Sequence, residues 1–177
     1  MLEIILISIV IAVIIFFIIA AMQPSDFRVT RTGTIAAPAS AVFVHVNDLQ
    51  KWNAWSPWAK LDPEAKNSFE GPSSGTGAIM RWAGNNKVGE GSMTITESRP
   101  DNFICFKLEF LKPFAATNTA EFTFSSEDNQ TVVTWTMYGK SNFIGKVIGL
   151  IMNCEKMVGG QFEQGLAALK SVVEEGL

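Results

Sequence analysis

The longest uninterrupted apolar stretch of the chain lies near its N-terminus. Across residues 4–22 only Ser8 falls outside the apolar set. At about 1.5 Å per helical residue, this stretch forms a helix of about 28 Å, close to the roughly 30 Å hydrocarbon core of a bilayer. It has no polar face, which argues against a buried helix of a soluble domain. We therefore predict a single-pass transmembrane anchor over residues 4–22.

A cleavable signal peptide is the alternative for this stretch. Such a peptide has a basic start, an apolar core of about 7–15 residues and a cleavage site with small side chains. Here the chain starts with Met1-Leu2-Glu3, and the stretch ends in Ala20-Ala21-Met22-Gln23, so an uncleaved anchor is favoured. Residues 23–26 form a short polar linker. Arg28 and Arg31 follow it, which favours a cytoplasmic position for the rest of the chain.

Alternating apolar and polar positions dominate the middle of the chain and predict strands. We expect a first strand over residues 27–35 and six more near residues 66–71, 77–83, 88–98, 102–111, 116–125 and 131–139. In the later strands one parity carries large apolar side chains, and the other carries Thr, Lys and Glu. Tyr138 and Arg81 fall on the polar parity. This pattern is typical of an antiparallel sheet covered on one face only.

Helical spacing marks the two remaining regions. Pro38 suits the first turn of a helix whose apolar face includes Val42 and Val46, and residues 49–54 predict a second short helix. From residue 143 to 175 one stripe recurs every three or four positions: Ile148, Met152, Glu155, Gly159, Phe162, Leu166, Leu169 and Val173.

This stripe predicts one long C-terminal helix, in which Gly159 and Gly160 either produce a bend or permit close approach to the sheet. A curved sheet gripping that helix would bury both apolar faces. The fold class is therefore α+β, in one domain over residues 27–175.

Composition and charge narrow the function. The 177 residues carry a net charge of −3, which argues against a nucleic-acid partner. The 13 Phe and 5 Trp residues exclude intrinsic disorder. His45 is the only histidine and lies off the apolar face of its helix, and Cys105 and Cys154 stand 49 residues apart. We therefore predict no metal, no cofactor and no nucleophilic triad; whether the two cysteines pair is open.

Several short motifs follow one another in a distinctive order. They are Ala37-Pro38 before Val42-Phe43, Trp52-Asn-Ala-Trp55-Ser56-Pro57-Trp58 before Asp62-Pro63, Gly75-Thr-Gly77, Trp82-Ala-Gly84-Asn85, Val88-Gly89-Glu90-Gly91, Thr134-Trp135 and Phe162-Glu163-Gln-Gly165-Leu166. Over residues 27–175 the chain resembles the START-like superfamily, which includes polyketide cyclase/dehydrase-type proteins and Bet v 1-like lipid binders. The resemblance implies a helix-grip fold with a hydrophobic cavity between the sheet and the C-terminal helix. It implies no single activity, because members include lipid carriers, hormone receptors and aromatase/cyclases.

The inward parity carries more aromatic and methionine bulk than a small core requires, and methionines adapt to irregular apolar ligands. The candidate ligand-binding residues are Met80, Trp82, Met93, Phe106, Leu108, Phe110, Asn118, Phe122, Trp135, Met137, Met152, Glu155 and Phe162. Asn118 and Glu155 are the polar members, and a buried carboxylate would suit ligand recognition or proton transfer. An interior filled completely by these side chains is the alternative.

The triplet Trp52, Trp55 and Trp58 has two interpretations. The favoured one is that these rings pack a short helix onto the sheet. The other is an aromatic rim over the cavity mouth, where large rings meet both apolar ligand and water.

Three functions follow from these features. We expect a membrane-anchored domain that binds a hydrophobic small molecule or lipid. The second possibility is a cyclase/dehydratase-like enzyme that uses Glu155, Asn118 or Tyr138 as acid, base or orienting groups, which requires at least two of them at one cavity. The third is a protein-interaction module at the membrane, with a filled interior.

Overall fold

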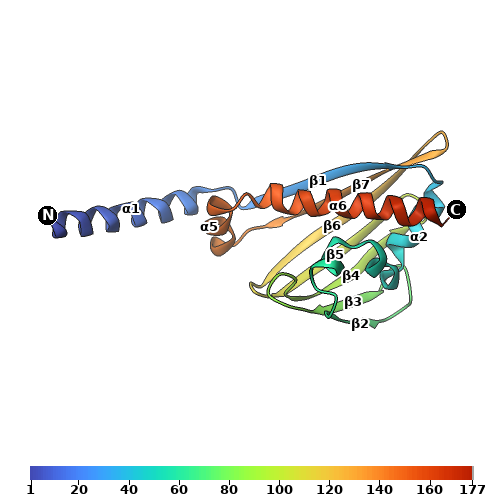
Figure 1. The fold of residues 1–177 in the computed structure, drawn as a ribbon, viewed down its shortest axis with the longest axis horizontal. Helices are drawn as coiled ribbons and strands as arrows, with labels where there is room; N and C mark the ends of the chain where they lie inside the picture. The colour runs from blue at the N-terminus through green and yellow to red at the C-terminus, as the bar shows by residue number, and fades with distance from the viewer. Residues whose placement is uncertain (177) are drawn as a thin grey trace.

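The computed structural model describes residues 1–176 and shows a seven-stranded antiparallel sheet curved around a long helix (Figure 1). The elements in chain order are α1 (Leu2–Met22), β1 (Asp26–Ile35), α2 (Ala39–Asn47), the 3-10 turn η1 (Leu49–Lys51), α3 (Trp52–Trp55), α4 (Pro57–Leu61), β2 (Lys66–Glu70), β3 (Ile79–Ala83), β4 (Glu90–Arg99), β5 (Phe103–Lys112), β6 (Ala116–Glu127), β7 (Gln130–Lys140), α5 (Phe143–Ile151) and α6 (Cys154–Glu175). The strand order is β1-β7-β6-β5-β4-β3-β2, so the first strand pairs with the last. The predicted α+β helix-grip fold is confirmed.

The alternation seen in the sequence becomes the two faces of this sheet. On the inner face, Phe122 of β6 pairs with Trp135 of β7, and both side chains are buried. On the outer face, Thr30 and Thr136 form a hydroxyl pair 3.1 Å apart, and the Tyr138 hydroxyl donates to Glu121 at 2.6 Å. This hydrogen bond is the main cause of the raised pKa of Tyr138. The sheet is therefore apolar on one side and polar on the other.

The C-terminal region is two helices, not the single helix that its apolar stripe predicts. α5 ends at Ile151, the backbone is extended at Met152, and α6 begins at Cys154. The break occurs because Asn153 caps α6: its side-chain oxygen accepts a hydrogen bond from the Lys156 amide at 2.9 Å. The three- to four-residue spacing of the predicted stripe continues from α5 into α6, so the sequence pattern gives no sign of the break.

Of the two roles predicted for Gly159, a bend or a close approach to the sheet, the structure shows the second. α6 continues through Gly159 without a break, and the glycine leaves room for a side chain of the sheet. A Cβ atom at this position would clash with the guanidinium of Arg31 on β1. Arg31 forms ion pairs with Glu155 at 2.8 Å and with Glu163 at 2.5 Å, one on either side of the glycine. The hydrogen bonds to Glu163 and Glu155 raise the pKa of Arg31. The edge strand is thereby fastened to the first half of α6.

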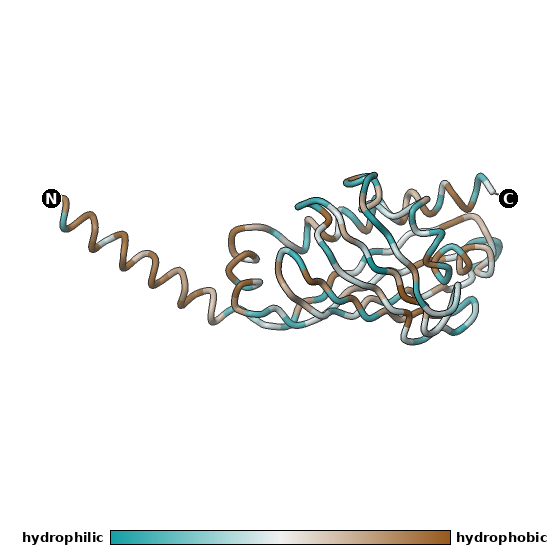
Figure 2. Tube along the Cα trace, turned by 90° about the horizontal axis from the view of Figure 1, so that it is seen from below, coloured by the Kyte–Doolittle hydropathy of each residue, from teal (hydrophilic) through white to brown (hydrophobic). Residues whose placement is uncertain are grey.

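α1 projects away from the domain, and apart from Glu3 and Ser8 it is apolar (Figure 2). Only Ala20 of this helix is buried, and the clustered core of the domain begins at Val29. Residues 23–25 connect α1 to β1. The helix is long and apolar enough to cross a membrane, a test that a signal sequence also passes. Because the core needs nothing from α1, we expect residues 24–177 to fold without it.

The short helices between β1 and β2 place two tryptophans on the sheet. Trp52 and Trp55 are buried, and their ring centroids lie 4.5 Å apart. Their indole N–H groups donate to the carbonyl oxygens of Val46 at 2.8 Å and of His45 at 3.0 Å. These two rings therefore pack the helices onto the sheet, as the favoured interpretation expects.

The sequence left open whether Cys105 pairs with Cys154. Cys105 is a free thiol, and the side chain of Cys154 lies outside the part of the chain that the structure describes.

His45 gives this fold a pH dependence. It is half-buried on α2, and burial is the main cause of its lowered pKa. The unfolded chain binds a proton near pH 6.5, whereas the folded chain does so only at lower pH. The stability contributed by the neutral imidazole is therefore complete above about pH 6.5 and is lost as the pH falls through the lowered folded pKa.

We expect the free energy of unfolding of residues 24–177 to fall more steeply between about pH 7 and pH 5 in the wild type than in His45→Gln. Urea unfolding at a series of pH values measures this difference. The comparison between the two proteins removes the contribution of carboxylates, which titrate in both. Parallel curves for the two proteins would show that His45 is not the responsible group.

Candidate functional site

A cavity of about 500 Å³ lies between the inner face of the sheet and the first half of α6. Such a volume falls within the roughly 300–1,000 Å³ of small-molecule sites. The lining residues come from α3, α4 and the segment after it, from β2 to β7, and from α6: Trp52, Asn53, Trp58, Ala59, Asp62, Pro63, Ala65, Asn67, Met80, Trp82, Val88, Met93, Leu108, Phe110, Ala120, Trp135, Met137, Val158 and Phe162. The lining is mostly aromatic and aliphatic, and the cavity counts against the alternative of a filled interior.

Stacked aromatic rings form one wall of this cavity. The Trp135 and Phe162 rings are nearly parallel, with centroids 4.0 Å apart. Trp58 meets both rings edge-on, at 5.8 Å from Trp135 and 6.3 Å from Phe162. Trp58 is half-buried. Of the three tryptophans at positions 52, 55 and 58, it is the one that fits the interpretation of an aromatic rim at the cavity mouth.

The structure places eight of the thirteen predicted residues on the cavity wall: Met80, Trp82, Met93, Leu108, Phe110, Trp135, Met137 and Phe162. These positions share the inward parity of β3, β4, β5 and β7, or the inward face of α6. They surround the part of the sheet that α2 and α3 leave uncovered.

Two aromatic candidates, Phe106 and Phe122, are absent from the lining although they face inward. The Trp52 ring packs edge-on against both of them, at 5.5 Å from Phe106 and 6.0 Å from Phe122. Both are fully buried as ordinary core. They therefore do not line the cavity, because the alternation along a strand predicts the face on which a residue lies and not what covers that face.

The two polar candidates also lie elsewhere. Asn118 is buried, and its side-chain oxygen lies so close to Gly139 that a Cβ atom there would clash with it. Glu155 is exposed and forms the ion pair with Arg31. Met152 is exposed at the break between α5 and α6. Neither residue is on the wall. Met152 lies at the break that the single-helix prediction missed, whereas Glu155 is in α6 with Phe162 but turns toward Arg31 of β1.

Three polar side chains of the cavity lining, Asn53, Asn67 and Asp62, were not predicted as site residues. Asn67 donates to the side-chain oxygen of Asn53 at 3.0 Å, and the Asp62 carboxylate accepts a hydrogen bond from the backbone N–H of Asn85 at 2.6 Å. The indole N–H of Trp135 is buried without a hydrogen-bond partner among the described residues. Asn53 and Asp62 belong to the tryptophan-rich motif and to the Asp62-Pro63 motif quoted above, and this was the available signal for them.

No catalytic constellation forms from the residues expected to provide one. Glu155, Asn118 and Tyr138 lie at a helix surface, beneath Gly139 and on the outer face of the sheet, respectively, and none of them lines the cavity. Within the described residues, no cluster of three or more His, Cys, Asp or Glu side chains is placed to hold a metal ion.

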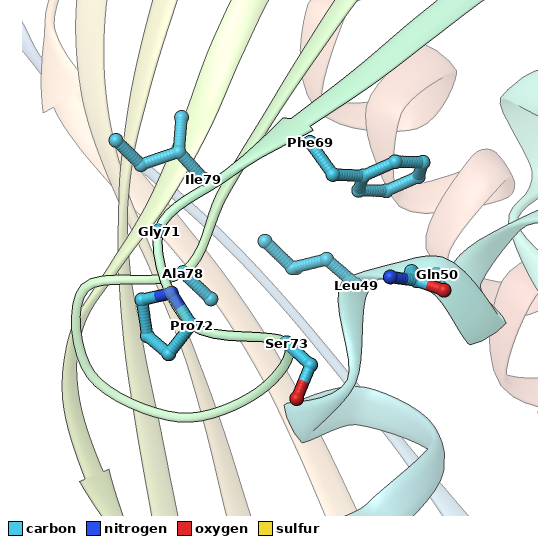
Figure 3. Close-up of a pocket in the computed structure, with 8 residues that line it drawn as sticks. All are labelled: Leu49, Gln50, Phe69, Gly71, Pro72, Ser73, Ala78 and Ile79. Carbon is cyan, nitrogen blue, oxygen red and sulfur yellow. The ribbon is translucent and has the colours of Figure 1, made fainter.

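A second hollow of about 190 Å³ lies where η1 faces the turn between β2 and β3 (Figure 3). In the close-up, Leu49 and Gln50 stand opposite the loop that carries Pro72 and Ser73. Its volume is below that of usual ligand sites. The larger cavity is therefore the candidate functional site.

Comparisons with known proteins agree with this fold. A family model described as polyketide cyclase / dehydrase and lipid transport matches residues 26–174. No curated protein matches the sequence.

Solved structures are similar in fold at low sequence identity. The Aha1 dimer structure from Colwellia psychrerythraea is 15% identical with a TM-score of 0.60, covering 84% of this chain and 96% of that one. The di-domain ARO/CYC protein BexL from the BE-7585A biosynthetic pathway is 16% identical with a TM-score of 0.60, covering 86% of this chain and 51% of that one. Ara h 8.0201 is 10% identical with a TM-score of 0.54, covering 82% and 99%.

Proposed function

Because the chain belongs to the polyketide cyclase/dehydrase and lipid transport family, we propose that it binds a hydrophobic small molecule or lipid in the cavity beneath α6. The observation that carries this proposal is the cavity itself, with a volume of about 500 Å³ and a mostly apolar lining. An apolar pocket with a few convergent polar groups is the usual form of a small-molecule site.

The polar groups of the wall suggest the kind of ligand. The cavity wall carries the amide side chains of Asn53 and Asn67, which are joined by a hydrogen bond of 3.0 Å. An apolar ligand with one polar group would hydrogen-bond to these amides while its apolar part contacts Met80, Met93 and Phe110. Fatty acids and aromatic polyketides both have this character.

We further propose that α1 is a single-pass membrane anchor. Its 21 residues span about 32 Å as a helix, which matches the hydrocarbon core of a bilayer. Ala20 is its only buried residue, and most of its large apolar side chains are exposed. Arg28 and Arg31 after the helix favour a domain on the cytoplasmic side. The anchor would hold the cavity where hydrophobic ligands partition.

Binding can be tested on residues 24–177. We expect native mass spectrometry to detect a co-purified lipid or other apolar molecule, and a fluorescent fatty acid to bind with displacement by unlabelled fatty acid. The discriminating variant is Val158→Trp, which adds an indole to the cavity wall from the half-buried face of α6. We expect it to weaken binding at least about tenfold, a loss of about 1.4 kcal/mol.

Ala167→Trp is the matched control, because it adds the same side chain to an exposed position of the same helix. It should bind like the wild type. If both variants bound the fluorescent fatty acid equally well, the fatty acid would bind outside the cavity, and the proposed site would be wrong. The absence of any bound species or displacement across common lipids would contradict the proposed function.

A further inference from the structure

Exposed apolar side chains gather at one end of the domain. α5 has no buried residue, and Ile144 and Ile151 are 48% and 71% exposed. Leu111 near the end of β5 and Phe114 in the turn between β5 and β6 are also exposed. We call Leu111, Phe114, Phe143, Ile144, Leu150 and Ile151 the apolar end surface; all six are exposed large hydrophobic residues. Patches of this kind on soluble domains usually mark a contact with a partner or a membrane.

The apolar end surface lies at the end of the sheet from which α1 emerges. Asp26 at the start of β1 pairs with Lys140 at the end of β7, and Asn118 near the start of β6 pairs with Gly139. The β5–β6 turn and α5 therefore project from the same edge as α1, opposite α2 (Figure 1).

The contact between α5 and α1 sets the depth of this surface. The Phe143 ring stacks on Phe17, with centroids 6.1 Å apart, and the Lys146 ammonium approaches the Ala21 carbonyl oxygen at 3.4 Å. Phe17 precedes the last residue of α1 by five positions, or about 7.5 Å of helix. α5 consequently lies alongside the end of α1, not beyond it. Amphipathic helices at membrane surfaces sit at this depth, with their apolar face about 5–10 Å into the boundary between headgroups and acyl chains.

The charges beside the apolar end surface suit lipid headgroups. Lys146 is the only charged residue of α5, and Lys112 and Lys140 end β5 and β7. Lys156 lies in the first turn of α6. These four lysines stand near the membrane-side edge although the chain as a whole carries a net charge of −3. Lys112 forms an ion pair with Glu90 at 2.7 Å, so Lys140, Lys146 and Lys156 are the lysines at this level that would attract anionic phospholipids.

We propose that the apolar end surface is immersed in the headgroup region of the membrane that holds α1. This inference rests on the proposed role of α1 as an anchor. The cavity reaches the same end of the domain, through Val88, Phe110 and Val158. A ligand would then pass between the bilayer and the cavity without crossing bulk water.

The test uses the full chain in vesicles of phosphatidylcholine mixed with phosphatidylglycerol. Cys105 and Cys154 are first replaced by serine, and single cysteines are then introduced as Ile144→Cys, Phe114→Cys or Val44→Cys. Each is labelled with a nitroxide, and its relaxation by oxygen, which concentrates in lipid, is compared with relaxation by a water-soluble nickel chelate. All three positions are exposed, so labelling leaves the core intact. Val44 on α2 at the opposite end is the matched control.

We expect oxygen to dominate at positions 144 and 114 and the nickel chelate to dominate at position 44. Flotation of the vesicles distinguishes the two ways of failing. Protein that floats with the vesicles while labels 144 and 114 stay accessible to nickel would overturn the inference and leave the anchor in place. Protein that does not float would overturn the anchor, and the inference with it.

Discussion

Replacing Trp52 with alanine is expected to lower the free energy of unfolding of residues 24–177 by about 3–5 kcal/mol. The indole is 4% exposed and contacts Trp55, Phe106, Phe122 and Trp135, with ring centroids 4.5–6.1 Å away. Its loss leaves a void where the short helices meet the sheet, and it leaves the Val46 carbonyl oxygen without its donor. Domains of this size are stable by about 5–15 kcal/mol, so the change removes a large share of the total. Guanidinium unfolding followed by circular dichroism measures it.

Two variants control for this result. Trp58→Ala removes a ring of the same size that is half-buried on the cavity wall, and we expect a smaller loss because solvent or ligand already reaches it. Trp52→Phe keeps an aromatic ring but removes the hydrogen bond to Val46, which is expected to cost about 1–3 kcal/mol. A loss in Trp52→Ala no greater than in Trp58→Ala would contradict the packing role of Trp52.

The second large effect is expected at Gly165, where α6 packs closely against Trp135 of β7 and Pro57 of α4. A Cβ atom at this position would lie 2.8 Å from the Trp135 ring and 3.1 Å from Pro57. Gly165→Leu should therefore push α6 away from the sheet and destabilise residues 24–177 by about 1–3 kcal/mol. Because Trp135 and the α6 residue Phe162 both line the cavity, the fluorescent fatty acid should also bind more weakly.

Gly160 is the matched control for Gly165, five residues earlier in the same helix. A Cβ atom at Gly160 meets nothing within 4 Å. Gly160→Ala should stabilise the same domain by about 0.5–1 kcal/mol, because alanine favours the helix and no contact opposes it. Effects of opposite sign would show that close packing, and not helix propensity, requires glycine at position 165. A destabilisation of equal size in both variants would contradict that explanation.

Strand parity was the most informative feature of the sequence. It predicted all seven strands to within a few residues, and it assigned Phe122 and Trp135 to the inner face and Thr136 to the outer face. This succeeded because an antiparallel sheet with one covered face forces period-two alternation on every strand. The first strand, residues 27–35, was identified in the same way, although its pairing with the last strand is a long-range contact.

The parts that failed depend on contacts between distant segments. Parity could not show that Trp52 covers Phe106 and Phe122, whereas Leu108 and Phe110 on the same strand stay open to the cavity. Apolar spacing could not show the end of α5 at Ile151, because a single capping side chain, Asn153, produced it. Apolar spacing also could not show that Glu155, although it lies in α6 with Phe162, forms an ion pair at the surface. Its true partner, Arg31, is more than 120 residues away in sequence.

The connection between α1 and β1 sets how far the domain can travel. Only residues 23–25 separate the two elements, and an extended chain of this length reaches roughly 10 Å. β1 gives no extra length, because it is hydrogen-bonded to β7 from Asp26 to Ile35. With α1 in a bilayer, the domain therefore works on the surface of that bilayer and cannot carry a ligand across the gap to another membrane. Delivery elsewhere requires an acceptor that comes to this surface, so we expect transfer of ligand to depend on collisions between donor and acceptor membranes.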